Sequence, residues 1–222
     1  MTISKFTLTM LIANLFALPA MAAGIDCKKP SSASDHMICG DQSLRARDAM
    51  MSDLYAAALK RDDANNIKER QQRWVKSLQS CQDATCVRQA YDDQISFFLT
   101  TKGGRGISTN FFAEGTNGTE GDLSIFGPVG GLSAIFLAST YVGPGGADAG
   151  DVNADNISGV IPLKAGHGQL SVDNCSIDFD RINDQSWRVT QTGVCNFADG
   201  VTMQGIYRPV HGSAGEASRT AN

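Results

Sequence analysis

Six cysteines constrain the fold of this chain more than any other feature of its sequence. All six follow an N-terminal segment typical of exported proteins: Cys27, Cys39, Cys81, Cys86, Cys175 and Cys195. Thiols of exported proteins meet an oxidising environment, in which an even set of cysteines forms a framework of disulfides. The sequence therefore predicts three disulfides and no free thiol.

The N-terminal segment, residues 1–23, predicts a cleavable signal peptide. One cationic residue precedes an apolar run at 6–18, and the small residues Ala20 and Ala22 suit the specificity positions of signal peptidase. That run is too short to cross a bilayer core of ~30 Å comfortably, and no later run is apolar for long enough. We expect cleavage near Ala22/Ala23 and a periplasmic or secreted protein without a transmembrane segment.

Cys81 and Cys86 are separated by four residues between two stretches that both read as helices. A redox pair normally has two intervening residues and a βαβ context, which this region lacks. A zinc site would need a second close pair of cysteines or histidines to complete its tetrahedron. A structural disulfide framework is the favoured interpretation.

The pairing of the six cysteines is predicted in part. Cys175 and Cys195 flank a predicted hairpin and are expected to pair. The other four allow three connectivities. We favour two local bridges, Cys27 with Cys39 and Cys81 with Cys86, although a helical hairpin would also allow Cys39 to meet Cys81.

The composition divides the mature chain into two halves, which predicts an α+β protein. Apolar residues recur at helical spacing over 43–60, 67–78 and 87–98, whereas short alternating runs between Gly- and Asn-rich turns predict antiparallel strands from 121 onward. We expect a disulfide-bridged helical hairpin or three-helix module, followed by a small antiparallel β sandwich or partly closed barrel. The expected organisation is 1–23 signal peptide, 24–102 helical domain, 103–120 linker, 121–209 β domain and 210–222 disordered tail.

Charge is unevenly divided between the halves. Residues 24–104 carry a net charge of +1 and residues 105–222 carry −6. The basic residues of the helical half, Arg47 among them, alternate with acids and are interpreted as a solvated face. The acidic second half argues against nucleic acid as a partner and favours a basic protein.

No catalytic constellation is found in the sequence. His36, His167 and His211 are interpreted as structural or merely exposed, and neighbouring carboxylates in a helix point in different directions. We therefore expect a protein that is not an enzyme and has no cofactor.

The segment "DAGDVNADN", residues 148–156, is the best remaining candidate for a site. Its alternation is similar to a calcium loop, but Asn156 stands where the turn glycine belongs and Pro162 where the bidentate glutamate belongs. An ordinary acidic loop is favoured over a metal site. Its aspartates, Asp148, Asp151 and Asp155, are the candidate partner-binding residues, because a Gly-rich loop has the freedom to enter a groove.

The helical half resembles the LprI-like lysozyme-inhibitor domain of exported bacterial proteins. The resemblance covers about residues 25–100 and rests on a cysteine after the signal, an Ile-Cys before the first helix, a Gln-x-x-Trp and two later tyrosines. The matching residues are Cys27, Ile38, Cys39, Tyr55, Gln71, Trp74, Cys81, Cys86 and Tyr91. Asp35, where the family usually has Glu, and Ser43 depart from the pattern. The second half more loosely resembles C-terminal regions attached to that domain.

This resemblance implies a cysteine-bridged helical module in the cell envelope and inhibition of a lysozyme-like muramidase. It supplies no inhibitory residue, because the matched positions all read as scaffold, with Trp74 and Tyr91 in the core. Two alternatives remain open. One is an immunity protein against a cell-wall-degrading toxin, and the other is a non-inhibitory envelope binding module.

Overall fold

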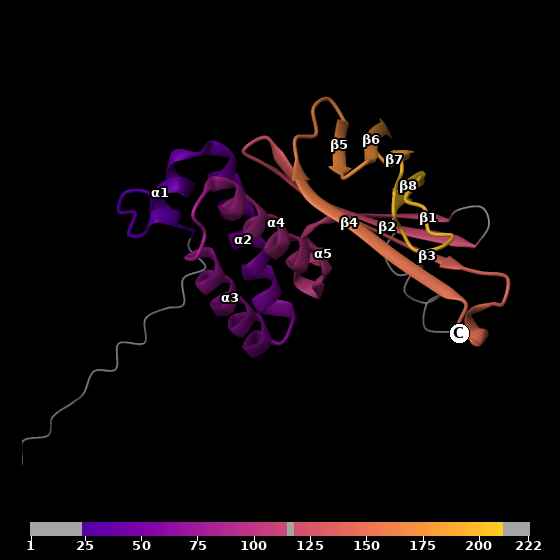
Figure 1. The fold of residues 1–222 in the computed structure, drawn as a ribbon, viewed down its shortest axis with the longest axis horizontal. Helices are drawn as coiled ribbons and strands as arrows, with labels where there is room; N and C mark the ends of the chain where they lie inside the picture. The colour runs from indigo at the N-terminus through magenta and orange to yellow at the C-terminus, as the bar shows by residue number, and fades with distance from the viewer. Residues whose placement is uncertain (1–23, 115–117, 211–222) are drawn as a thin grey trace, which may run out of the picture.

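A computed structural model describes residues 24–114 and 118–210, and Figure 1 shows that they form a helical half beside an antiparallel sheet. The predicted α+β class is confirmed. The expected signal peptide and the expected tail beyond residue 210 lie outside the described residues.

Five helices form the first half, and each begins at a side-chain cap. They are α1 (Ala33–Gly40), α2 (Gln42–Arg61), α3 (Ala64–Leu78), α4 (Ala84–Thr100) and α5 (Lys102–Ile107). Backbone N–H groups in the first turn of a helix have no acceptor inside the helix. In each of the five helices, a cap side chain accepts a hydrogen bond from at least one of these groups. The caps are Ser32, Asp41, Asp63, Asp83 and Thr101. The three apolar stripes of the sequence correspond to α2, α3 and α4.

The core of the helical half forms where these stripes meet. Tyr91 is fully buried and Trp74 is 9% exposed, and their rings form a T-shaped pair with a centroid distance of 5.0 Å. The indole Nε1 of Trp74 donates to the carbonyl of Ala90 at 2.8 Å, so its polar atom is satisfied within the core. The expectation that both rings are core residues is confirmed.

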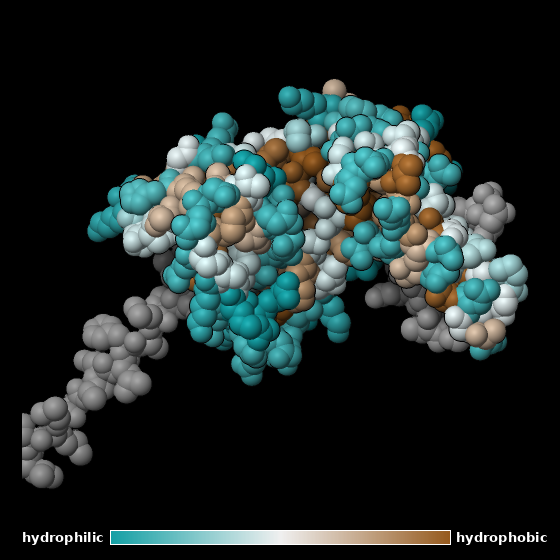
Figure 2. All heavy atoms as spheres, in the orientation of Figure 1, coloured by the Kyte–Doolittle hydropathy of each residue, from teal (hydrophilic) through white to brown (hydrophobic). Residues whose placement is uncertain are grey.

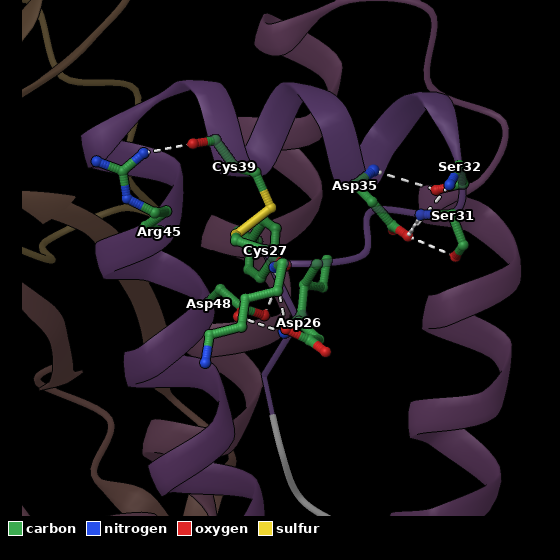
Figure 3. The surroundings of a disulfide bond; sticks show 11 residues. Asp26, Cys27, Ser31, Ser32, Asp35, Cys39, Arg45 and Asp48 are labelled. Atoms are coloured by element: carbon green, nitrogen blue, oxygen red, sulfur yellow. Dashed lines mark hydrogen bonds between the residues drawn. A yellow bond between two sulfur atoms is a disulfide. The ribbon is translucent and has the colours of Figure 1, made fainter.

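Two disulfides brace the ends of these helices, in the local pairing that the sequence favoured. Cys27 bonds to Cys39 and thereby ties the N-terminal segment to α1, as Figure 3 shows. Cys81 bonds to Cys86 across the corner between α3 and α4. Figure 3 also shows the reciprocal cap at the start of α1, where Ser32 and Asp35 bond to each other's backbone.

Eight antiparallel strands form the second half, in the order β4-β3-β2-β1-β8-β7-β6-β5. Their bounds are β1 (Thr109–Glu114), β2 (Thr119–Val129), β3 (Leu132–Val142), β4 (Val152–Ile161), β5 (His167–Val172), β6 (Cys175–Asn183), β7 (Ser186–Gly193) and β8 (Gly205–Pro209). The sheet curls into a nearly closed barrel. Its interior holds fully buried Leu123, Ile135, Ile177 and Phe179. The predicted Cys175–Cys195 disulfide joins the start of β6 to the connection after β7.

The helices cover the outer face of β2, β3 and β4. Side chains alternate between the two faces of a strand, so Ile135 and Leu137 of β3 enter the barrel while Ala134 joins the helical core. Val160 of β4 joins that core as well. Figure 2 shows apolar side chains gathered in the waist between the helices and the strands. The two halves therefore share a packed interface.

The stretch 103–120, which we expected to be a linker, instead contains α5, β1 and the first residues of β2. Gly103, where the expected linker begins, lies instead in a close contact between α5 and α2. The backbone N–H groups of Lys102 and Gly103 both donate to the carboxylate of Asp62 at the end of α2. A Cβ added at Gly103 would lie 2.3 Å from the carbonyl carbon of Ala57.

Gly103→Ala is therefore expected to destabilise the protein. No flexible side chain can move aside, because the clash is with the backbone of α2, and overpacking of this kind costs about 1–3 kcal/mol. Gly40→Ala is the matched control, since a Cβ at Gly40 meets nothing within 4 Å. Urea unfolding of both variants measures the difference. Equal stability of the two variants would contradict the packed α2–α5 contact.

Candidate functional site

One end of the barrel, opposite the helices, gathers acidic side chains from several connections. The antiparallel order places the β1–β2, β3–β4, β5–β6 and β7–β8 connections at this end, and Figure 1 shows the β3–β4 connection far from the helices. Hydrogen bonds link these connections: Val142 N–H donates to Gly118 O at 3.0 Å, Asn153 Nδ2 donates to Asp199 O at 2.9 Å, and Val194 N–H donates to Asn174 O at 3.0 Å.

We call this surface the acidic end. It comprises Glu120, Asp148, Asp151, Asp155, Asp173 and Asp199. In its described segments, 118–120, 143–156, 172–175 and 194–204, there is no Lys, Arg or His. A patch of one sign attracts oppositely charged partners over distances of about 10 Å at 0.1 M salt. The basic residues Lys164, Arg181 and Arg188 lie on segments at or towards the other end of the barrel.

The three predicted partner-binding aspartates all belong to the acidic end, but their side chains differ in the hydrogen bonds that they accept. Asp148 is exposed in the short 3-10 helix η1 (Ala147–Ala149) and has no side-chain hydrogen bond or ion pair among the described residues. Asp151 accepts a hydrogen bond from Gly145 N–H at 2.8 Å and so closes its own loop. Asp155 accepts from Ala198 N–H at 3.2 Å.

The expectation of one acidic loop over residues 148–156 is therefore wrong in part. Val152 to Asn156 form the first half of β4 and pair in register with β3. Asp and Asn are unusual inside strands, but Asn153 and Asp155 stand at the barrel end, where the backbone at Ala198 and Asp199 supplies their partners. The candidate residues lie on an ordered surface rather than a loose loop.

Asp173 and Asp199 also belong to the acidic end and, like Glu120, were missed by the sequence analysis. Both are exposed, and neither side chain has a hydrogen bond or ion pair among the described residues. Asp173 has a positive φ of 51°, a turn conformation that Asp and Asn tolerate. "VDNC" and "ADG" were visible as turn signals, but only closure of the barrel brings Asp173 to the cavity that Asp155 also lines and Asp199 to its hydrogen bond with Asn153.

The β7–β8 connection plugs the acidic end from inside. Val201 and Met203 of this connection are 8% and 0% exposed and pack into the barrel core. The hydroxyl of Tyr207 donates to Met203 O at 2.9 Å, and Gln191 Oε1 accepts from Met203 N–H at 3.1 Å. The Cys175–Cys195 disulfide fixes the start of the same connection. These contacts hold the β7–β8 connection in place at the acidic end, and order of this kind lowers the entropic cost of binding.

A second cluster of ionisable groups lies in the helical half, at Asp48 of α2. Its carboxylate accepts hydrogen bonds from Ile25 N–H at 2.8 Å and from the Tyr91 hydroxyl at 2.9 Å, and so it anchors the N-terminal segment. Burial raises the pKa of Asp48 above its ordinary value, and these two hydrogen bonds offset only part of that effect. Burial and the nearby Asp48 carboxylate also raise the pKa of Tyr91.

Asp48→Asn is expected to change how stability depends on pH. A carboxyl whose pKa is higher in the folded state binds its proton more tightly there, so its contribution to stability falls as the pH rises from about 3.8 through the folded-state pKa. The variant should therefore gain stability relative to the wild type as the pH rises through that interval. Urea unfolding over a pH series measures this, with Asp53→Asn as an exposed control. A pH-independent difference would contradict the burial of this charge.

Other ionisable groups give no recognisable reaction centre. His167 Nδ1 and Asp180 Oδ1 lie 2.6 Å apart, but both side chains are exposed on neighbouring strands. In the described ranges, 24–114 and 118–210, no three His, Cys, Asp or Glu side chains gather in an arrangement that could hold a metal ion. No helix in the described part of the chain combines the length and apolar character needed to cross a membrane.

Comparison of the chain with known protein families, with curated proteins and with solved structures finds no match.

Proposed function

We propose that this chain is an exported cell-envelope protein that binds and inhibits a lysozyme-like peptidoglycan hydrolase, and that the acidic end is the binding surface. The observation that carries the proposal is the set of carboxylates from several separate connections, with no basic side chain in their described segments. The resemblance of residues 25–100 to lysozyme-inhibitor domains supplies the class of target. Export follows from the leader, with cleavage near Ala22/Ala23.

The physical basis of the proposal is charge complementarity. Lysozymes of the animal type are strongly basic around the cleft that binds glycan, so the acidic end would be attracted to the rim of that cleft. Complementary potentials raise the rate of encounter, and a surface already fixed by a disulfide and buried residues loses little entropy when it binds. A bound inhibitor then prevents glycan from entering the cleft. The protein acts by occupancy and needs no catalytic residue of its own.

Exposed valines beside the carboxylates add apolar contact area. Val152, Val172 and Val194 are 42%, 49% and 67% exposed around the acidic end. Apolar side chains flanked by charges are typical of protein interfaces, in which the centre is desolvated and the rim remains polar. The same valines would bring no advantage to a surface that stays in water.

The test is a lysis assay with the purified chain starting at Gly24. Increasing amounts are added to a basic animal-type lysozyme acting on bacterial cell walls, and the rate of lysis is expected to fall until the inhibitor matches the enzyme. The same protein after reduction and unfolding is the control. Absence of both inhibition and binding would contradict the proposal.

Two further results would favour the alternatives. Inhibition confined to one cell-wall-degrading toxin, with no effect on lysozyme, would indicate an immunity protein. Binding to peptidoglycan sacculi without inhibition of any hydrolase would indicate an envelope binding module.

A further inference from the structure

The two edge strands of the sheet, β4 and β5, face each other across a seam without a hydrogen-bonded ladder between them in the described structure. Side chains close the part of this seam that lies nearer the helices. Leu170 of β5 packs where a Cβ on Gly159 would lie, and Arg47 of α2 donates to Val160 O at 3.1 Å. This part of the edge is therefore covered.

The seam opens at the acidic end. A cavity of ≈ 230 Å³ lies there between Asp155 to Ile157 of β4, Val172 and Asp173 beside the β5–β6 turn, and Val194 after β7. Ala154 and Asn156 of β4 are exposed here. The first half of the β4 edge, at the acidic end, is thus accessible from the same side as the exposed carboxylates.

The backbone groups of alternate β4 residues point away from β3 and towards the seam. Asn156 N–H donates to Asp155 Oδ1 at 2.8 Å, and Val160 C=O accepts from Arg47. The partners of these two backbone groups are therefore side chains and not the backbone of β3. In an antiparallel strand, the N–H and C=O groups of every second residue point to the same side. The groups of Ala154 and Ser158 therefore also point away from β3, towards the seam.

We infer that the β4 edge at the acidic end receives an extended segment of a basic protein as an added strand. Backbone hydrogen bonds to Ala154, Asn156 and Ser158 give the added strand its position. Its Lys and Arg side chains reach Asp148 and Asp173, while their aliphatic stems pack on the exposed valines. Where the partner is the hydrolase, this inference rests on the proposed function and specifies how the contact is made.

The charges on this end decide between a basic partner and a second copy of this chain. Edge strands of two copies would pair by bringing their acidic ends together, and like charges placed side by side oppose that association. Asp155 also occupies the Asn156 donor in the free protein, which protects the edge from indiscriminate pairing. A segment rich in Lys or Arg has no such penalty.

The test uses two synthetic peptides of alternating lysine and valine, which are identical in charge. One has an unmodified backbone and the other carries an N-methyl group on every residue, which removes its backbone donors. The unmodified peptide is expected to bind the full chain at least tenfold more tightly and to slow amide hydrogen exchange within residues 152–158. Equal binding of the two peptides, or protection confined to other residues, would overturn the inference.

Variants at Ala154 provide the matched test from the protein side. Ala154→Pro removes one seam-facing N–H, which is tolerated at a sheet edge because the β3 ladder does not use it. Ala154→Thr keeps that N–H. The proline variant should lose at least tenfold in affinity for the unmodified peptide, and the threonine variant less than twofold. Equal affinities in folded proteins would overturn the inference, and if the proline variant does not fold, the hydrogen-exchange result decides alone.

A basic lysozyme then separates the inference from the proposed function. If the peptide results hold and lysozyme is not bound, the edge site stands and the proposed function fails. If lysozyme is bound while residues 152–158 gain no protection from exchange, the proposed function stands and strand addition fails.

Discussion

Asp92→Ala is expected to lower the free energy of unfolding by about 3 kcal/mol, because removal of one partner leaves the other charge buried and uncompensated. Asp92 lies on α4 and accepts two hydrogen bonds from Arg47 of α2, at 2.7 Å and 3.2 Å. The side chain of Arg47 is 6% exposed, and its remaining partners are Val160 O and Ser43. The pair therefore joins two helices to the barrel.

The control for this prediction is a solvent-exposed Arg–Asp ion pair on the surface of the same protein. Arg181 and Asp184 lie 3.3 Å apart with side chains 47% and 98% exposed, and Asp184→Ala should change stability by less than about 1 kcal/mol. Urea unfolding measures both variants. Similar costs would show that burial of the Arg47–Asp92 pair is not what makes it important.

A double replacement tests the same reasoning in the opposite direction. Arg47→Met with Asp92→Leu removes both charges and fills their space with apolar atoms, and such replacements of buried ion pairs are often neutral. The double variant should therefore regain much of the stability lost by Asp92→Ala. The recovery is expected to be incomplete, because Val160 O loses its donor.

Local sequence signals predicted α2, α3, α4 and much of the sheet, whereas α1 and α5 were not predicted. The apolar stripes of α2, α3 and α4 and the short alternating runs of the strands each depend on residues close together in the chain. The three disulfides span separations of 12, 5 and 20 residues, so their pairing was accessible to the same reasoning.

Features that depend on distant contacts could not be predicted in this way. Arg47 was interpreted as a solvent-facing residue, because its acceptor at Val160 lies 113 residues away. Gly103 was interpreted as part of a linker, because its close approach to Ala57 is a property of the packed helices. Asp148, Asp151 and Asp155 marked one part of the acidic end, but its remainder depends on how the barrel closes.

The second large effect is expected from neutralising the exposed carboxylates of the acidic end. Asp148, Asp173 and Asp199 are the residues to change to Asn, because their side chains have no hydrogen bond or ion pair among the described residues. Asp151 and Asp155 are left in place, since both accept backbone hydrogen bonds that hold the surface together. The variant should fold normally and associate with a basic lysozyme about tenfold more slowly at low salt.

A matched variant with the same change in net charge is available. Asp53, Glu69 and Asp184 are exposed acids away from the acidic end, and their conversion to amides removes three charges as well. If only the total charge of the protein governed encounter, the two triple variants would behave alike. Local steering predicts that the control associates at nearly the wild-type rate.

The most direct test of the central claim is the association rate of these three proteins with a basic animal-type lysozyme, measured by stopped flow from low salt to about 0.5 M, where charges are screened beyond a few ångströms. The account predicts a wild-type rate that falls steeply with salt, a control variant that follows it, and an acidic-end variant that is slow throughout with a shallow slope. Identical rates and identical salt slopes for the wild type and the acidic-end variant would contradict it.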